Sequence, residues 1–183
     1  MAVPLQMSKT PKNQAKIDEV AAALYEIIYP DPFPPPDIVP SNPDVKIGLP
    51  GHPSFLAGLE VGVGAANCVI SSEGGFLLFN NGPGGPGTGA AVTLFKNSGV
   101  LFKVYITIIF GDVNGDANIT GLDAGLVVNA ENYLVNWDSA TGAAMKTAGD
   151  VNGDGNVTGA DAGIMVNIEN FAQDIDQSTG TVS

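Results

Sequence analysis

Residues 112–123 read Asp112-Val-Asn-Gly-Asp-Ala-Asn-Ile-Thr-Gly-Leu-Asp123, and residues 150–161 read Asp150-Val-Asn-Gly-Asp-Gly-Asn-Val-Thr-Gly-Ala-Asp161. The similarity continues through residues 133 and 171, so that 15 of 22 positions are identical at an offset of 38 residues. Only small or apolar side chains differ between the two copies. A repeat of fixed period indicates that one structural unit is present twice.

Each copy carries oxygen-bearing side chains at positions 1, 3, 5, 9 and 12, with a further asparagine at position 7. Calcium prefers six to eight oxygen ligands, and a loop with this spacing can wrap them around one ion. We expect position 7 to bind through its main-chain carbonyl, position 9 through water, and position 12 through both carboxylate oxygens. The predicted ligands are Asp112, Asn114, Asp116, Asn118, Thr120 and Asp123 in the first loop, and Asp150, Asn152, Asp154, Asn156, Thr158 and Asp161 in the second.

Acidic charge gathers around the two repeats. Of the net charge of −12, residues 111–183 carry −10 (eleven acids against Lys146) and residues 1–110 carry −2 (eight acids against six lysines). Three carboxylates in one loop would repel one another strongly without a cation, so we expect two Ca²⁺ ions and extensive unfolding on their removal. This charge, with no arginine in the chain, excludes nucleic acid as a partner, because phosphate binding needs cationic side chains.

A helical pattern of apolar residues follows each loop. The first helix would bury Leu122, Leu126, Val127, Ala130, Tyr133 and Leu134, and the second Ala160, Ile164, Met165, Ile168 and Phe171. Neither helix has enough apolar surface for a core of its own, so we expect the two to pack on each other.

Paired loops of the form Asp-x-Asn-x-Asp-x-Asn-x-x-x-x-Asp, each followed but not preceded by a helix, resemble the type I dockerin family. The resemblance covers residues 111–177. It implies two calcium-binding F-hand repeats, related to EF-hands, that attach their bearer to a cohesin domain of a scaffold or cell surface. By position in the motif, the partner-binding residues would be Leu122, Val128 and Asn129 in the first repeat and Ala160, Val166 and Asn167 in the second.

This chain departs from the family pattern at two places. Position 6 usually holds a glycine in a left-handed turn; Gly155 fits, whereas Ala117 does not, at a cost of about 1 kcal/mol. We therefore expect the first site to bind calcium more weakly than the second. Many members carry a Ser/Thr pair at positions 10 and 11, where this chain has Gly121-Leu122 and Gly159-Ala160. The expected partner face is accordingly apolar and nearly symmetric.

The rest of the chain predicts three further parts and an α+β fold class. Residues 1–29 show an amphipathic helical pattern, with Thr10 as the expected N-cap and Pro11 in the first turn. Residues 30–43 hold seven prolines and are expected to form an extended, semi-rigid linker. Residues 44–110 contain six short β-type runs and predict a small β-sandwich-like module before the all-α pair of loop–helix motifs in residues 111–183. This module is similar to the small β domains that precede dockerins in bacterial surface proteins.

Catalytic chemistry has little support in this sequence. His52 is the only histidine and Cys68 the only cysteine, which excludes a multi-histidine metal site and an internal disulfide bond. The glycine-rich stretch 81–89 lacks the Lys-Ser/Thr pair of a phosphate-binding loop. The acidic clusters are explained as calcium ligands, so we expect no enzymatic activity.

Two functional hypotheses stay open. The first is a calcium-dependent docking module that binds a cohesin-like protein domain in an extracellular or cell-surface assembly. The alternative is a self-assembling, calcium-stabilised structural subunit of a surface fibre or filament, which binds copies of itself through the N-terminal helix and linker. The abundance of calcium outside cells favours an extracellular location, although the first residues show no signal-peptide pattern. No apolar run reaches the 18 residues of a membrane span, so we expect no membrane insertion.

Overall fold

The computed structural model describes residues 11–28, 33–137 and 139–183. The chain divides into two compact units, Met1–Pro34 and Pro35–Ser183. The first unit contains helix α1 (Pro11–Ile28), with a proline in its first turn as predicted. The apolar residues Ile17, Val20 and Leu24 of α1 are exposed within this unit. The predicted N-cap, Thr10, lies outside the described residues.

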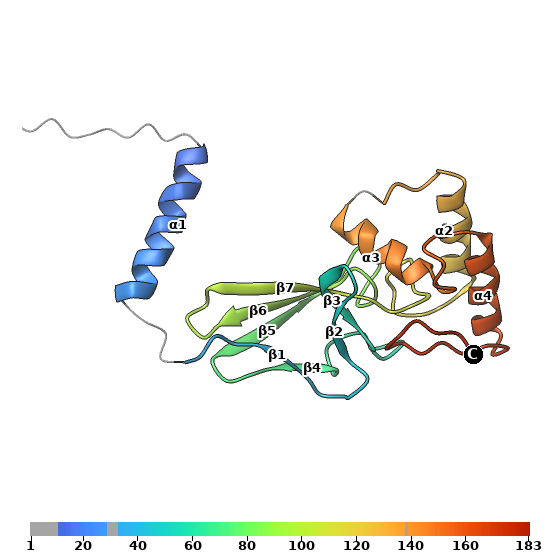
Figure 1. The fold of residues 1–183 in the computed structure, drawn as a ribbon, viewed down its shortest axis with the longest axis horizontal. Coiled ribbons are helices and arrows are strands. Elements are labelled where there is room, and N and C mark those ends of the chain that lie inside the picture. Colours follow the sequence, from blue (N-terminus) through green and yellow to red (C-terminus); the bar gives the residue numbers. More distant parts are fainter. Residues whose placement is uncertain (1–10, 29–32, 138) are drawn as a thin grey trace, which may run out of the picture. The chain divides into compact units, whose positions relative to one another are not determined.

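Seven strands form two sheets in the second unit (Figure 1). The larger sheet has the order β2 (Lys46–Leu49), β3 (His52–Ala57), β7 (Leu101–Thr107), β6 (Ala91–Lys96) and β5 (Gly75–Asn80). Its neighbours are antiparallel except for β3 and β7, which are parallel. The smaller sheet pairs β1 (Ile38–Pro40) with β4 (Val69–Ser71). We call residues 35–110 the β module and residues 111–183 the loop–helix part.

One apolar core lies between the two sheets. Ile38 and Val69 of the smaller sheet are buried in the same cluster as Leu56, Leu94 and Tyr105 of the larger sheet. Alternation of side chains along the strands explains this arrangement, because every second residue of β6 and β7 points to the same face. The expected α+β fold class is confirmed.

The predicted linker differs from the structure at its C-terminal end. Ile38–Pro40 pair with β4 instead of forming a free spacer, and Ile38 is buried. Pro40 is compatible with a strand here because β1 pairs with β4 on one side only. Proline has no N–H group, but a group that points away from β4 would have no partner strand to bind, so no hydrogen bond of the sheet is lost. The proline count therefore predicted extended backbone but missed the pairing.

Three helices complete the second unit, where the sequence analysis expected two. They are α2 (Gly121–Glu131), α3 (Ala140–Gly149) and α4 (Gly159–Glu169). The helices α2 and α4 contact each other, as predicted. Four large residues of the apolar faces that were expected to be buried are instead exposed: Leu122, Tyr133, Leu134 and Phe171. Each begins at a threonine of the repeat, Thr120 or Thr158, which closes a capping box with the aspartate three residues later. The unpredicted helix α3 has a small buried face, formed by Ala144 and Ala148, which gives little periodic signal in the sequence.

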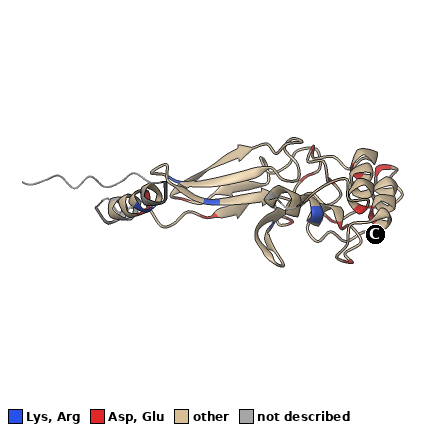
Figure 2. Cartoon of the chain, turned by 90° about the horizontal axis from the view of Figure 1, so that it is seen from above, with Lys and Arg blue, Asp and Glu red and all other residues tan. Residues whose placement is uncertain are grey.

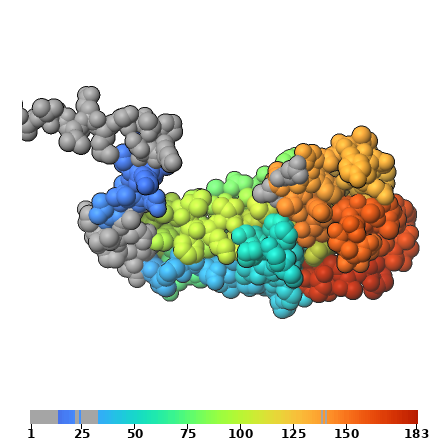
Figure 3. All heavy atoms as spheres, turned by 45° about the horizontal axis from the view of Figure 1, so that its top comes forward, coloured from blue at the N-terminus to red at the C-terminus, as the bar shows by residue number. Residues whose placement is uncertain are grey.

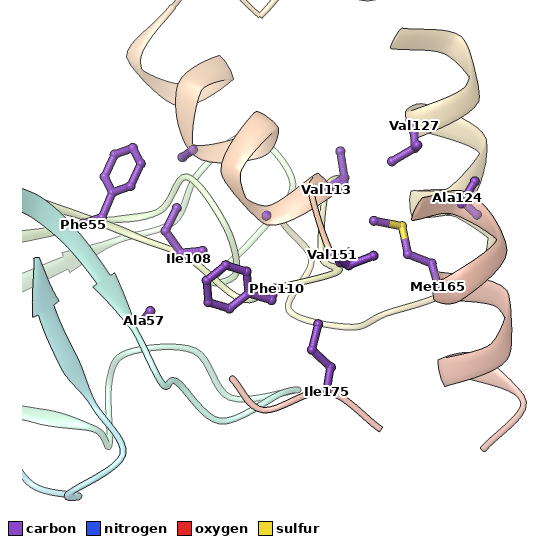
Figure 4. Close-up of a cluster of buried hydrophobic side chains, with 13 residues drawn as sticks. Phe55, Ala57, Ile108, Phe110, Val113, Ala124, Val127, Val151, Met165 and Ile175 are labelled. Atoms are coloured by element: carbon purple, nitrogen blue, oxygen red, sulfur yellow. The ribbon is translucent and has the colours of Figure 1, made fainter. Parts of the chain in front are cut away.

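A second apolar core joins the β module to the loop–helix part. Figure 4 shows Phe55, Ile108 and Phe110 of the β module in one cluster with Val113 and Met165. The C-terminal segment, residues 172–183, contributes Ile175 to this core. Within this segment, the side chain of Gln177 accepts from the Phe110 N–H group (2.7 Å) and donates to the Phe110 carbonyl (2.9 Å). The space-filling view shows the C-terminal segment against the β module (Figure 3). The two parts therefore belong to one compact unit.

Candidate metal centre

Both loops are folded by hydrogen bonds from backbone N–H groups to the predicted ligand side chains. At position 1, Oδ2 of Asp112 accepts from the Ala117 N–H group (3.1 Å), and Oδ2 of Asp150 accepts from the Gly155 N–H group (2.9 Å). These bonds turn the chain back toward its first carboxylate. The two copies thus share the hydrogen bond from position 6 to position 1.

Positions 3 and 5 form the same tight turns in both copies. In the second loop, Oδ1 of Asn152 accepts from the Asp154 N–H group (2.8 Å), and Oδ1 of Asp154 accepts from the Asn156 N–H group (2.8 Å). The first loop repeats both bonds at 2.8 Å. Such side-chain-to-backbone bonds are typical of Asn and Asp in turns, which explains why the repeat uses these residues.

The aspartates at position 12 close each loop from the first turn of the following helix. Asp123 and Asp161 are completely buried. In Asp123, Oδ1 accepts from the N–H groups of Val113 (2.8 Å) and Asn114 (2.9 Å), whereas Oδ2 accepts from that of Thr120 (2.9 Å). Position 12 therefore holds the start of the loop and the start of the helix together, where the sequence analysis expected it.

Burial makes the first loop unfavourable for negative charge. It raises the pKa of Asp112 to about 6, although N–H groups of Thr88 and Gly115 oppose the shift; the charge of Asp123 adds to it. The pKa of Asp123 is also raised, mainly by burial. Because a divalent cation beside these carboxylates would favour their charged form, the electrostatics of the loop suit a metal ion.

The second loop offers a direct test of fit to calcium. Oδ1 of Asp150 is buried and has no hydrogen-bond partner among the described residues. A buried oxygen without a partner costs free energy, and a bound cation would provide the missing interaction. All predicted donors in the loop are oxygen atoms, which suits a hard cation such as calcium. The residues present therefore fit calcium.

The ligand assignment stays a prediction. Across residues 11–28, 33–137 and 139–183, no three Asp, Glu, His or Cys side chains come together in an arrangement that could hold a metal ion. In both loops an asparagine amide instead lies against a carboxylate: Nδ2 of Asn114 donates to Oδ2 of Asp116 (3.0 Å), and Nδ2 of Asn152 donates to Oδ2 of Asp154 (3.1 Å). Amide, hydroxyl and main-chain oxygens would have to complete each predicted coordination shell.

The two loops differ in their surroundings. Asn152 to Asn156 of the second loop are exposed, whereas Gly115 and Ala117 of the first are buried against the β module. Ala117 has a φ of 72°, so position 6 adopts the left-handed conformation expected from the motif even without glycine. Thr88 was not among the predicted site residues, although its N–H group donates to Oδ2 of Asp112 (2.8 Å). The glycine-rich stretch around Thr88 was the only signal in the sequence, and it does not indicate which residues Thr88 contacts.

Comparison with known families supports the motif assignment. Residues 110–177 match the dockerin type I domain. The predicted resemblance is thereby confirmed for this segment, which we call the dockerin segment. The match indicates calcium-dependent protein–protein docking, generally to cohesin domains, with Ca²⁺ as the expected cofactor. Comparison of the chain with curated proteins and with solved structures gave no match.

The exposed side of α2 and α4 brings together four of the six predicted partner-binding residues of the dockerin segment. An open groove of about 710 Å³ runs between the two helices. It is lined by equivalent residues of the two repeats: Ala124, Gly125, Val128 and Asn129 from α2, and Ala162, Gly163, Val166 and Asn167 from α4. Leu122 and Ala160 are exposed near the helix starts but do not line this groove.

Charge is arranged around this face rather than on it. In the cartoon of Figure 2, many of the acidic residues, coloured red, lie toward the C-terminal end of the second unit. The groove between α2 and α4 contains no charged residue. Within the described part of the chain, no helix is long and apolar enough to span a membrane. Dockerin type I domains are protein-interaction modules.

Proposed function

We propose that the dockerin segment is a calcium-dependent docking module that attaches this chain non-covalently to a cohesin-type domain in an extracellular or cell-surface assembly. The observation that supports this most is the face formed by α2 and α4. Val128 and Val166 occupy equivalent positions on it and are each 41% exposed. An uncharged groove with flanking apolar side chains is suited to burial against another protein.

Calcium would control this face through the helix starts. The position-12 aspartates Asp123 and Asp161 lie in the first turns of α2 and α4. An ion held by each loop therefore fixes where each helix begins. Oε2 of Glu131, at the end of α2, accepts from the N–H group of Gly159 at the start of α4 (3.0 Å), which links the two helices directly. We expect loss of calcium to separate α2 from α4 and to destroy the groove.

The test is a binding titration of the full chain against a panel of cohesin domains, with calcium and with EGTA. A complex that forms only with calcium supports the proposal. The variants Val128→Asp and Val166→Asp place a charge on the face, and together they should weaken that complex by at least about 100-fold. Ile70→Asp in β4 is the matched control, because Ile70 is also an exposed apolar residue (57%) but lies in the β module. Equal weakening by the control variant would refute the assignment of the face.

Self-assembly is the second candidate, and one observation favours it. The apolar stripe of Ile17, Val20 and Leu24 on α1 is exposed in the first unit. The larger sheet of the second unit also exposes apolar side chains, among them Phe76 and Leu78. A helix stripe and a sheet face of this kind each need a covering layer. Copies of the chain would then associate through α1.

Light scattering and electron microscopy in calcium separate the two candidates. Filaments or large oligomers that disappear in Val20→Asp would support self-assembly. Glu19→Gln, a polar substitution on the same helix, is the control and should leave the particle size unchanged. A monomer at all concentrations would exclude this candidate.

We also infer that the chain is not an enzyme, and turnover of any substrate by the isolated chain would contradict that.

A further inference from the structure

The first calcium loop is in direct contact with the glycine-rich stretch of residues 81–89, which we call the Gly loop. The Thr88 N–H group donates to Oδ2 of Asp112 (2.8 Å), the carboxylate at position 1. One residue earlier, the Gly87 N–H group donates to the Gly115 carbonyl (3.0 Å). Two consecutive N–H groups of the β module thus bind the chain of the first loop.

Thr88 is itself hydrogen-bonded to Ile109, in the segment that connects β7 to the first loop. It is fully buried, and its Oγ1 donates to the Ile109 carbonyl (3.1 Å) and accepts from the Ile109 N–H group (3.0 Å). Since Ile109 lies three residues before Asp112, these bonds define the distance between the Gly loop and the first carboxylate. Thr88 is therefore a positioning residue that acts on the predicted calcium ligand through its own backbone.

The glycines of the Gly loop are required by space. A Cβ atom on Gly84 would lie 1.8 Å from the Asn114 carbonyl oxygen, and one on Gly87 would lie 2.0 Å from Oδ2 of Asp112. Neither glycine is in the left-handed region, so backbone conformation does not explain them. Close approach to the first calcium loop does.

A second part of the β module contacts the same loop at position 6. The Gly62 N–H group donates to the Ala117 carbonyl (2.6 Å). The side chain of Ala117 is completely buried in the core of the β module, in one cluster with Leu59 and Ala65. An alanine at this position gives the loop a methyl group to bury in that core, which accounts for the departure from glycine.

The second loop lacks these contacts and acts as an internal comparison. Position 4 is Gly115 in the first loop, where a Cβ would lie 2.6 Å from the Thr88 carbonyl oxygen. Its equivalent Gly153 meets no atom of the described chain within 4 Å of such a Cβ, and neither does Gly155 at position 6. The same motif is therefore enclosed in one copy and open in the other.

We propose that the Gly loop and residue 62 form the outer wall of the first calcium site, so that calcium at this site and the folding of the β module stabilise each other. The second site has no such wall and exchanges its ion with solvent more rapidly. This inference rests on the proposed calcium binding of both loops. The β module then contributes to calcium binding at the first site. The first repeat stabilises the folded unit, whereas the second repeat responds to changes in free calcium.

The experiment is a calcium titration of the full chain followed by NMR through single amide signals. Thr88 and Gly62 report on the wall, Gly115 on the first loop, and Gly155 on the second. We expect the wall signals to move with Gly115. They should still move in the variant Asp154→Ala, which removes a second-loop carboxylate, and should not move in the matched first-loop variant Asp116→Ala. Wall signals that stay constant while Gly115 moves, or that follow Gly155, overturn the proposal.

Variants of the wall test the same inference without changing a predicted ligand. Thr88→Val removes both hydroxyl bonds and should lower the calcium affinity of the first site by about 10-fold or more, as expected for an outer-shell partner. Thr88→Ser keeps these bonds and should restore the affinity. Gly84→Ala should also weaken the first site alone, whereas Ile70→Ala, at an exposed position of β4, should change the calcium affinity of neither site. Unchanged first-site affinity in both Thr88→Val and Gly84→Ala overturns the proposal. No calcium uptake at either loop instead refutes the proposed function itself.

Discussion

At the scale of single residues, Ala117 and Gly155 hold the same loop position in different surroundings. Both adopt a positive φ, 72° and 87°, which costs an alanine about 1 kcal/mol. The methyl group of Ala117 is buried in the β-module core, whereas a Cβ on Gly155 would lie in open space. The weaker calcium binding predicted for the first site rests on the backbone strain alone, and it stays a prediction. Burial of the Ala117 methyl group stabilises the loop and therefore opposes the cost of the strain.

This difference predicts unequal effects of two reciprocal substitutions. Ala117→Gly relieves the strain but loses a buried methyl worth about 0.8 kcal/mol, so calcium affinity at the first site should change less than about 3-fold. Gly155→Ala adds the strain with no packing in return and should weaken the second site by about 5-fold. Calorimetric titration of each variant measures both sites. A large gain in Ala117→Gly would show that the methyl group contributes nothing.

The raised pKa of Asp112 predicts that protons compete with calcium at the first site. With a pKa of about 6 in the calcium-free fold, Asp112 is mostly protonated at pH 5 and mostly ionised at pH 7. An ion that binds at pH 5 must displace this proton, so first-site affinity should be about 10-fold lower at pH 5 than at pH 7. Because the pKa of Asp112 lies above its ordinary value of 3.8, the calcium-free fold becomes more stable as pH falls from 6 toward 4.

Two calcium titrations, at pH 7 and pH 5, check this prediction. Asp112→Asn serves as the control, because an amide does not titrate, and the pH dependence of its residual affinity should be smaller than that of the unmodified first site. An equal affinity of the unmodified first site at both pH values would contradict the account of the buried carboxylate.

At the scale of elements, the Gln177 side chain attaches the C-terminal segment to Phe110, three residues after the end of β7. Gln177 forms two hydrogen bonds with the backbone of Phe110, and its carbonyl accepts from the Gly58 N–H group (2.6 Å). Gln177→Ala removes the first two bonds and leaves the N–H group and the carbonyl of Phe110 without these hydrogen bonds. The free energy of unfolding should fall by about 1–3 kcal/mol.

Urea unfolding in calcium measures this loss. Gln173→Ala is the matched control, since the Gln173 side chain accepts a hydrogen bond from Asn167 at the exposed surface (2.9 Å), and it should change stability by less than about 0.5 kcal/mol. Similar losses in the two variants would show that the Phe110 contact does not hold the segment.

The elements also show what sequence alone predicts. The two helices that follow the loops were predicted, because the spacing of apolar residues within one repeat determines them, whereas the ligand assignment stays a prediction. Helix α3 was not predicted, since its buried face consists of Ala144 and Ala148 and the segment shows no large apolar stripe. Pairing of β1 with β4 was missed because seven prolines between residues 30 and 43 argue against strands. Thr88 and Asp112 are 24 residues apart, so their contact depends on the tertiary fold.

At the scale of the whole molecule, residues 35–183 share two cores that cross the boundary between the β module and the dockerin segment. Ala117 lies in the core of the β module, while Phe55 and Ile108 lie in the core of the helices. The unit should therefore unfold in one thermal transition in calcium, at a midpoint that rises with calcium concentration. At 100 times the dissociation constant, each ion adds about 2.7 kcal/mol. Circular dichroism and intrinsic fluorescence should report the same midpoint, and two separate transitions would contradict this.

The most direct test of the central claim is a calorimetric calcium titration of the full chain, with circular dichroism before and after addition of a chelator. The account predicts two bound ions per chain and the loss of α2 and α4 helical signal on chelation. No calcium uptake, or helical signal that is indifferent to the chelator, would contradict it, because the duplicated loops would then have lost their ligand function and the docking face its means of control.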